Sequence, residues 1–275
     1  MKYESIPRIF SQGAHGAVPD AIGAAPPRFG LLDSSERRWP NLLKRIKQLN
    51  ERETGAAIYK LIIFARHGQG VHNVAEAKYG SGAWNERWAM LEGDGELTWG
   101  PDPSLTSLGE CQATDVNALW HSELAAGAPL PEKLYCSPLT RALQTQQITF
   151  AGIQTPRVVI LENCREEYGA HTCDRRRSKT LIQQRFPEFD VEAGFAEEDK
   201  LHTQVRETSQ HVTRRAKLVL DHIFTHDVDS VVISITAHGG IINGFLRAMG
   251  RDPYGLPTGG VLPVVVRGWC EQSAH

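Results

Sequence analysis

Residues 59–73 read YKLIIFARHGQGVHN, and this stretch decides the fold. The apolar run 61–65 stops at a turn signal, which predicts a buried strand of the parallel kind with both faces covered. Arg66 and His67 follow directly, at the carboxyl end of the strand, where open α/β sheets bind ligands. A guanidinium holds oxyanions and a neutral imidazole is a competent nucleophile. The pair therefore predicts a site that binds and attacks a phosphate group.

The rest of the chain alternates between apolar runs and amphipathic stretches of ten or more residues. Such alternation predicts a three-layer α/β/α fold with a mixed, mostly parallel central sheet. Further strands are expected at 133–136, 158–161, 230–236 and 261–267. Helices are expected at 39–49, 105–125, 142–150, 204–226 and 241–249, with Ser107 and Glu110 spaced as a capping box for the second of them.

Two regions lack regular periodicity. Residues 1–35 are rich in Gly, Ala and Pro, which predicts an extended arm packed over the domain surface. Residues 170–200 are charged and irregular. We therefore expect an N-terminal arm and helix at 1–56, packed on a catalytic domain at 57–275. The aromatic stretch 74–100 carries Trp84 and Trp88 one helical turn apart, which indicates a docked helix that could wall a pocket.

Composition excludes several classes of protein. With 41% hydrophobic and 23% charged residues, the chain has the composition of an ordinary globular protein. A formal net charge of -2 argues against a nucleic-acid partner. The five cysteines are scattered without a zinc spacing, and no apolar stretch predicts a signal peptide or membrane span. We expect a cytoplasmic protein without metal or cofactor, and nothing in the sequence specifies its oligomeric state.

Other predicted strands also end in reactive polar groups. Arg141 follows the strand at 133–136, Glu166 and Glu167 follow the strand at 158–161, and His238 follows the strand at 230–236. Because the carboxyl ends of parallel strands lie on one edge, these groups can converge on His67. Two guanidiniums would neutralise a phosphate monoester dianion, and a carboxylic acid would protonate the departing alkoxide.

Four segments together resemble the histidine phosphatase superfamily, the group that includes the phosphoglycerate mutases. They are RHG at 66–68, the Leu-Thr and Gly of 105–109, SPLTRA at 137–142 and AHGG at 237–240, in the family's order. A closer resemblance, to a fungal phosphoglycerate mutase-like branch, rests on RHGQGVHN at 66–73 and REEYGAHTCDRR at 165–176.

The resemblance implies roles for individual residues. His67 would be the nucleophile that becomes phosphohistidine, and Glu166 would be the general acid, with Glu167 left open as the alternative. The other groups implied at the phosphate are Arg66, Asn73, Arg141, His238 and Gly239. From the residues alone, His72, His171 and Arg175 are further candidates for contacts to the substrate, with packing or solvated surface as the alternative.

The resemblance thus favours a phosphomonoesterase acting on a small phosphorylated metabolite. A phosphoglycerate mutase-like phosphotransferase is the first alternative, because the two differ only in whether water or a second hydroxyl accepts the phosphoryl group. There are two further alternatives. The same fold could carry out acid/base chemistry on a substrate without phosphate, or it could serve as a binding protein.

Overall fold

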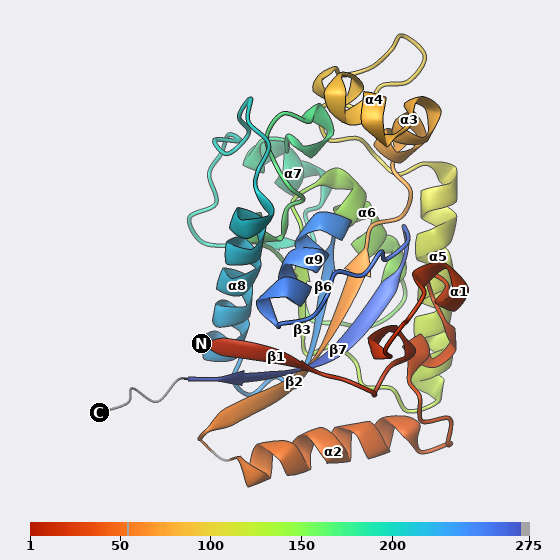
Figure 1. The fold of residues 1–275 in the computed structure, drawn as a ribbon, viewed down its shortest axis with the longest axis vertical. Helices are drawn as coiled ribbons and strands as arrows, with labels where there is room; N and C mark the ends of the chain where they lie inside the picture. Colours follow the sequence, from red (N-terminus) through yellow and green to blue (C-terminus); the bar gives the residue numbers. More distant parts are fainter. Residues whose placement is uncertain (54, 271–275) are drawn as a thin grey trace.

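A computed structural model describes residues 1–53 and 55–270, and its centre is a sheet with the strand order β1-β7-β2-β6-β3-β4-β5 (Figure 1). The strands are β1 (Lys2–Ile6), β2 (Ala57–Arg66), β3 (Lys133–Cys136), β4 (Val158–Ile160), β5 (Asp190–Val191), β6 (Val232–Ala237) and β7 (Val261–Trp269). From β2 to β5 all neighbouring strands are parallel, whereas β7 runs antiparallel to both β1 and β2. The predicted mixed, mostly parallel sheet is confirmed.

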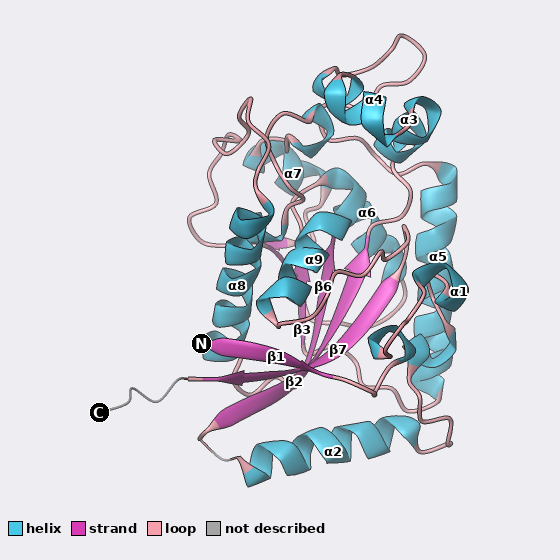
Figure 2. Ribbon diagram, viewed as in Figure 1, coloured by secondary structure: helices cyan, strands magenta, loops and turns pink. Residues whose placement is uncertain are grey.

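Helices cover both faces of the sheet (Figure 2). The α-helices are α1 (Pro19–Ile22), α2 (Arg38–Arg52), α3 (Val71–Tyr79), α4 (Ser81–Glu86), α5 (Ser107–Ala125), α6 (Thr140–Thr149), α7 (Lys179–Arg185), α8 (Ser209–His226) and α9 (Gly239–Ala248). Short 3-10 helices are η1 (Ser11–Gly13), η2 (Pro27–Gly30), η3 (Trp88–Met90), η4 (Glu162–Cys164) and η5 (Thr172–Asp174). None of these described helices is long and apolar enough to cross a membrane.

Strand β2 shows why three layers form. Its side chains alternate between the two faces of the sheet, as the pleat requires. Leu61 and Ile63 join the core under α2, α5 and α6, whereas Ile62 and Phe64 join the core under α8 and α9. Both sets are buried, which explains why the strand reads as a continuous apolar run. The predicted α/β/α architecture is confirmed.

The N-terminal arm contributes a strand that the sequence did not predict. Residues 2–6 form β1, which pairs antiparallel with β7 at the edge of the sheet. Five residues with mixed polarity carry too little periodicity to indicate a strand on their own, and β1 exists because β7 offers it a partner. The strand β5 was not predicted either, because two residues are too few to show a periodic pattern.

Several predicted helix starts differ from the structure, since α6 begins at Thr140 rather than at residue 142 and α9 at Gly239 rather than at residue 241. Helix α5 is capped by Thr106, whose side chain accepts the N–H of Gly109, so the predicted capping box at Ser107 is wrong by one residue. Helix α8 begins at Ser209 rather than at Gln204, because the side chain of Thr208 caps it. Residues 204–208 are therefore loop, which has consequences for the site described below.

Helix α2 is tied to α5 by one buried carboxylate. Glu123 Oε2 accepts the indole N–H of Trp39 at 2.8 Å and two N–H groups of Arg38 at 3.1 and 3.0 Å. Both Trp39 and Glu123 are almost completely buried. Because a buried donor without a partner is costly, this carboxylate fixes the position of α2 on the domain.

Replacing Glu123 by alanine is expected to lower the free energy of unfolding by about 2–3 kcal/mol, because the Trp39 indole and the Arg38 guanidinium lose their acceptor. Urea unfolding of the variant against Asp115→Ala, an exposed carboxylate of the same helix, measures the difference. Equal stability of the two variants would contradict this account of how α2 is held.

Beyond the carboxyl end of β2, α3 and α4 form a cap over the domain (Figure 1). Trp84 of α4 packs edge-to-face on Trp99 with ring centroids 5.5 Å apart, and Trp88 in η3 stacks on Tyr79 at 3.9 Å. These rings form a separate small core, but the single helix expected from the spacing of Trp84 and Trp88 is wrong, because α4 ends at Glu86 and Trp88 lies in η3. The cap stands next to the strand end that carries Arg66 and His67.

Candidate active site

The order of the strands brings the reactive groups together. His67 follows β2, His238 follows β6, and Arg141 lies in the first turn of α6, directly after β3. Glu166 follows β4 and the short helix η4. Because β2, β6, β3 and β4 are consecutive parallel neighbours, all four groups stand at one edge of the sheet.

His67 is a buried, neutral imidazole in a defined tautomer. Its Nδ1 lies 2.7 Å from the carbonyl oxygen of Gly68. Since a carbonyl oxygen only accepts, Nδ1 carries the ring proton and Nε2 keeps its lone pair. Burial lowers the pKa of His67 well below its ordinary value, and the nearby charges of Arg141 and Arg66 lower it further. The ring therefore presents a nucleophilic nitrogen at neutral pH.

His238 lies against His67, with ring centroids 4.9 Å apart. Its Nε2 is 2.7 Å from the hydroxyl of Ser137, and that hydroxyl oxygen already accepts the N–H of Leu139. When the Ser137 hydroxyl donates to Nε2, the ring proton of His238 lies on Nδ1, which is then a donor for a ligand.

Arg66 and Arg141 lie next to the same site, and other residues hold their guanidiniums in place. Arg66 donates from Nη1 to the carbonyl of Leu256 at 2.8 Å, and Arg141 donates from Nη1 to the carbonyl of Cys173 and from Nη2 to Asp174, both at 2.8 Å. Nη1 of Arg66 and both Nη atoms of Arg141 thus hold the two guanidiniums in place. The Nε atoms of both arginines are buried without a hydrogen-bond partner.

Glu166 rests on the N-terminus of α9. Its carboxylate accepts the N–H groups of Gly240 at 3.0 Å, Ile241 at 3.2 Å and Glu167 at 3.0 Å. A Cβ on Gly240 would lie 2.2 Å from Glu166 Oε1, so only glycine admits the carboxylate here. The first N–H of this helix, on Gly239, has no partner within the described chain and is available to an anion.

Arg66, His67, Arg141 and Glu166 line a cavity of about 150 Å³, whereas His238 and Gly239 lie outside its lining. Its walls come from β2 and α3, from α4, from α6, and from the segment between β4 and α8. The lining residues are Arg66, His67, His72, Asn73, Glu76, Trp84, Asn85, Arg141, Glu166, His171, Cys173, Asp174 and Arg206.

Most residues that the sequence predicted for the site meet in this cavity. Besides Arg66, His67, Arg141 and Glu166, the structure places His72, Asn73 and His171 in its wall. Asn73 accepts the N–H of Gly70 at 2.9 Å through Oδ1, which aligns α3. Glu167 is half-buried beside Arg206, 3.7 Å away, and is not part of the lining.

The structure does not bring Arg175 to the cavity. Its side chain is exposed on the surface, which was the alternative reading. Its neighbour Arg176 is buried and structural, because it pairs with Glu162 at 2.8 Å and donates to backbone carbonyl groups between 177 and 198. The basic run thus serves to fold the segment.

Several lining residues escaped the sequence analysis. Asp174 and Arg206 pair at 2.7 Å in the wall of the cavity, and Glu76 and Asn85 come from the cap, as does Trp84, whose stretch was expected to wall a pocket. Arg206 was read as part of a helix, whereas it lies in the loop before the Thr208 cap. The Thr208-Ser209 pair was the available signal that the helix starts later.

The glycine after His67 reflects a close approach of two backbones. A Cβ on Gly68 would lie 2.2 Å from the carbonyl oxygen of Gly109, and one on Gly109 would lie 2.2 Å from the carbonyl oxygen of Gln69. The N–H of Thr106 donates to the same Gln69 oxygen at 2.9 Å. The segment at 105–109 therefore supports the loop that holds His67.

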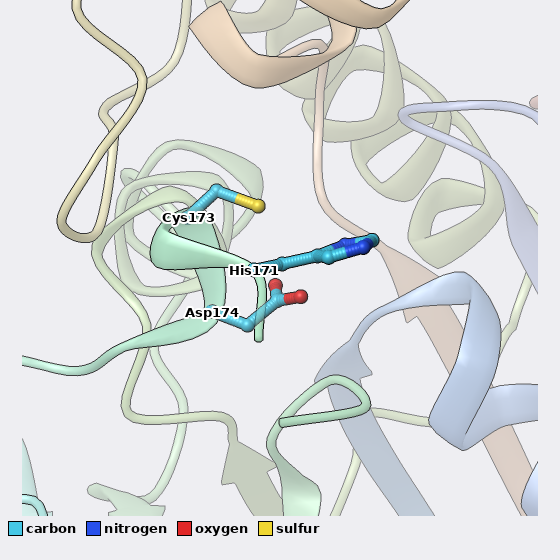
Figure 3. Close-up of side chains that lie close together, drawn as sticks. All are labelled: His171, Cys173 and Asp174. Atoms are coloured by element: carbon cyan, nitrogen blue, oxygen red, sulfur yellow. The ribbon is translucent and has the colours of Figure 1, made fainter. Parts of the chain in front are cut away.

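His171, Cys173 and Asp174 lie close together beside the cavity (Figure 3), with one donor atom of each within 4.8 Å of the others. Such a set could in principle ligate a metal ion. However, both oxygens of Asp174 are engaged, Oδ1 with Arg141 and Oδ2 with Arg206. The remaining donors, on His171 and Cys173, lie close to the guanidiniums of Arg141 and Arg206, whose positive charges disfavour the binding of a cation.

The imidazoles of the cavity predict a loss of stability in acid. Burial is the largest cause that holds the pKa of His67, His72 and His238 well below the ordinary value of 6.5, and it lowers the pKa of His171 to about 4. Below pH 6.5 the unfolded chain binds protons that the native state does not, so stability is fully present above pH 6.5 and falls as the pH drops.

We expect each fully buried imidazole to cost at most about 1.4 kcal/mol per pH unit, and the partly exposed His171 to cost less because solvent screens it. Thermal unfolding between pH 7.5 and 5 measures the slope. The His171→Gln variant should show a shallower slope, whereas the exposed control His121→Gln should not. A melting temperature that is constant over this range would contradict the prediction.

Comparison with known proteins shows the family of the chain. The chain matches the family described as Histidine phosphatase superfamily (branch 1) over residues 62–258. It is 36% identical to a "Probable phosphoglycerate mutase" of Arthroderma benhamiae, over 97% of this chain and 84% of that protein. It is 34% identical to "Phosphomutase-like protein 3" of Candida albicans, over 96% and 80%. The crystal structure of the Alpha-ribazole Phosphatase from Shigella flexneri covers 74% of this chain and 89% of its own, with 17% identity and a TM-score of 0.47.

Proposed function

Because this chain belongs to the histidine phosphatase superfamily, we propose that it is a phosphomonoesterase that hydrolyses a small phosphorylated metabolite through a phosphohistidine at His67. One observation carries the proposal. Three buried nitrogens without a hydrogen-bond partner belong to residues that line the cavity, namely Nε of Arg66, Nε of Arg141 and Nδ1 of His72, and a fourth is Nδ1 of His238, whose ring packs against His67. Buried polar atoms left unpaired are costly, and a bound phosphate would supply the missing partners.

In the first step, the lone pair on His67 Nε2 attacks phosphorus and the bond to the ester oxygen breaks. Glu166 gives a proton to the departing oxygen, so that the alcohol leaves neutral. The guanidiniums of Arg66 and Arg141, with the Gly239 N–H, offset the charge on the phosphoryl oxygens. The products of this step are the free alcohol and a phosphohistidine.

In the second step, water attacks the phosphohistidine. Glu166, now a carboxylate, accepts a proton from that water as the P–N bond breaks. The electron pair of the broken bond returns to His67 Nε2, and inorganic phosphate is released. Three backbone N–H donors orient the carboxyl group of Glu166.

A phosphotransferase is the second candidate, favoured by the mutase names of the fungal relatives. It would use the same first step and pass the phosphoryl group to a second hydroxyl. Incubation with an aryl phosphate, with and without a polyol acceptor, separates the two functions by the ratio of released phenol to released phosphate. EDTA is added because all groups invoked are side chains or backbone N–H. We expect equal release of phenol and inorganic phosphate, also when a polyol acceptor is added.

Phenol release in excess of phosphate, with a phosphorylated polyol as the balance, would favour the phosphotransferase. Absence of any phenol release from the folded protein, over pH 5–8, would reject both forms of the proposal and favour acid/base chemistry or binding without catalysis.

A further inference from the structure

The positive charges of the cavity are already partly balanced by one carboxylate. Asp174 accepts from Arg141 through Oδ1 at 2.8 Å and from Arg206 through Oδ2 at 2.7 Å. It is buried, so its charge acts on both guanidiniums with little screening. The three groups together carry one net positive charge. Arg66 adds a second, since it makes no ion pair with any described carboxylate within 4.0 Å.

The imidazoles add no charge at neutral pH. Burial lowers the pKa of His67, His72, His238 and His171 below the ordinary value for histidine. With Glu166 protonated as the general acid, Arg66, Arg141, Arg206 and Asp174 of the lining carry two net positive charges, which a phosphate monoester dianion neutralises fully. No cationic charge of the lining remains for a second anionic group on the substrate.

The outer end of the cavity carries a further carboxylate. His67 and His238, at the inner end, are completely buried, whereas Glu76 and Asn85, from the cap, are more exposed. Glu76 lies one turn after Asn73 on α3, so both face the cavity. Glu76 Oε1 accepts the hydroxyl of Ser81 at 2.9 Å, and no cation within 4.0 Å pairs with its charge in the described chain.

We propose that the site selects phosphate monoesters whose alcohol carries no negative charge, and that Glu76 excludes esters with a second anionic group. This inference rests on the phosphomonoesterase function proposed above. A carboxylate on the alcohol would have to lie at the outer end, beside Glu76 and without a free cation, and like charges placed together oppose binding. Asn85 beside Glu76 offers the hydrogen bonds that a neutral polyol uses.

Glycerol 3-phosphate and 3-phosphoglycerate form a matched pair, because they differ only in a hydroxymethyl group against a carboxylate. We expect kcat/KM of the wild-type protein to favour glycerol 3-phosphate at least about tenfold, because an unpaired carboxylate meets Glu76. The Glu76→Gln variant should narrow this ratio by raising kcat/KM for 3-phosphoglycerate. High salt should narrow it too, since ions screen the repulsion.

The control is Glu86→Gln, an exposed glutamate of α4 outside the cavity lining, which should leave the ratio unchanged. Binding measured by calorimetry with the His67→Ala protein gives a second readout that needs no turnover. Tighter binding or faster turnover of 3-phosphoglycerate than of glycerol 3-phosphate would overturn the inference, and so would a ratio insensitive to Glu76→Gln. If the proposed phosphomonoesterase function is wrong, the wild-type protein turns over neither ester. The preference for glycerol 3-phosphate in binding can still be measured in that case, so the two failures are distinguishable.

Discussion

Replacing His67 by alanine is expected to lower kcat/KM for an aryl phosphate by about 10,000-fold or more, the scale on which enzymes lose activity with their nucleophile. The substitution removes the Nε2 lone pair that attacks phosphorus, and no other described group takes its place: His238 donates from Nδ1 and is bound by Ser137 at Nε2. His121→Ala, an exposed imidazole of α5, is the matched control and should retain full activity.

The same variant tests the covalent intermediate. Wild-type protein mixed with a phosphate-labelled aryl ester and quenched in alkali should retain label on protein, because a phosphoramidate survives base better than acid. His67→Ala should retain none. Labelling of the variant at the wild-type level, or phosphate release at an undiminished rate, would show that another group is the nucleophile. Circular dichroism establishes that the variant is folded.

The second large effect is expected at Glu166, and it should depend on the leaving group. Loss of a general acid costs about 100- to 10,000-fold where the departing oxygen needs a proton. Glu166→Gln should therefore hydrolyse alkyl phosphates slower by that factor. With an aryl phosphate, whose phenolate leaves without help, the first turnover should stay fast and the later turnovers should be slow.

A burst of phenol equal to the enzyme concentration is thus the signature of Glu166→Gln, because water still lacks its base in the second step. Glu167→Gln is the matched control. This neighbour lies outside the cavity lining and faces Arg206, and burial is the largest cause that raises its pKa. If Glu167→Gln shows the burst and Glu166→Gln does not, the two roles are exchanged.

The sequence predicted those site residues that directly follow the carboxyl ends of strands. His67, Arg141, Glu166 and His238 each follow a strand that is visible as an apolar run, and parallel strands place their carboxyl ends on one edge. No long-range contact has to be known for that argument. The two-faced burial of β2 is readable in the same way, from its continuous apolar composition.

The irregular segment shows what local patterns cannot supply. Asp174, Arg175 and Arg176 are adjacent and all charged, yet the turn at η5 buries Asp174 and Arg176 and leaves Arg175 exposed. Which of them turns inward depends on partners distant in sequence, Arg206 among them. Such pairing has no periodic signature, so the Asp174–Arg206 pair in the cavity wall could not be predicted from the sequence alone.

The register of β1 with β7 also bears on how the chain folds. Lys2 pairs with Trp269 and Ile6 pairs with Val265. Strand β1 can therefore form its hydrogen bonds only after nearly the whole chain has been synthesised. The central strand β2 is flanked by β6 and β7, which also come late in the sequence. Contacts of this kind close large loops, and proteins dominated by them fold slowly. During synthesis on the ribosome, the apolar residues of β2 therefore stay without their partner strands until β6 and β7 emerge, and exposed apolar segments of this kind favour aggregation.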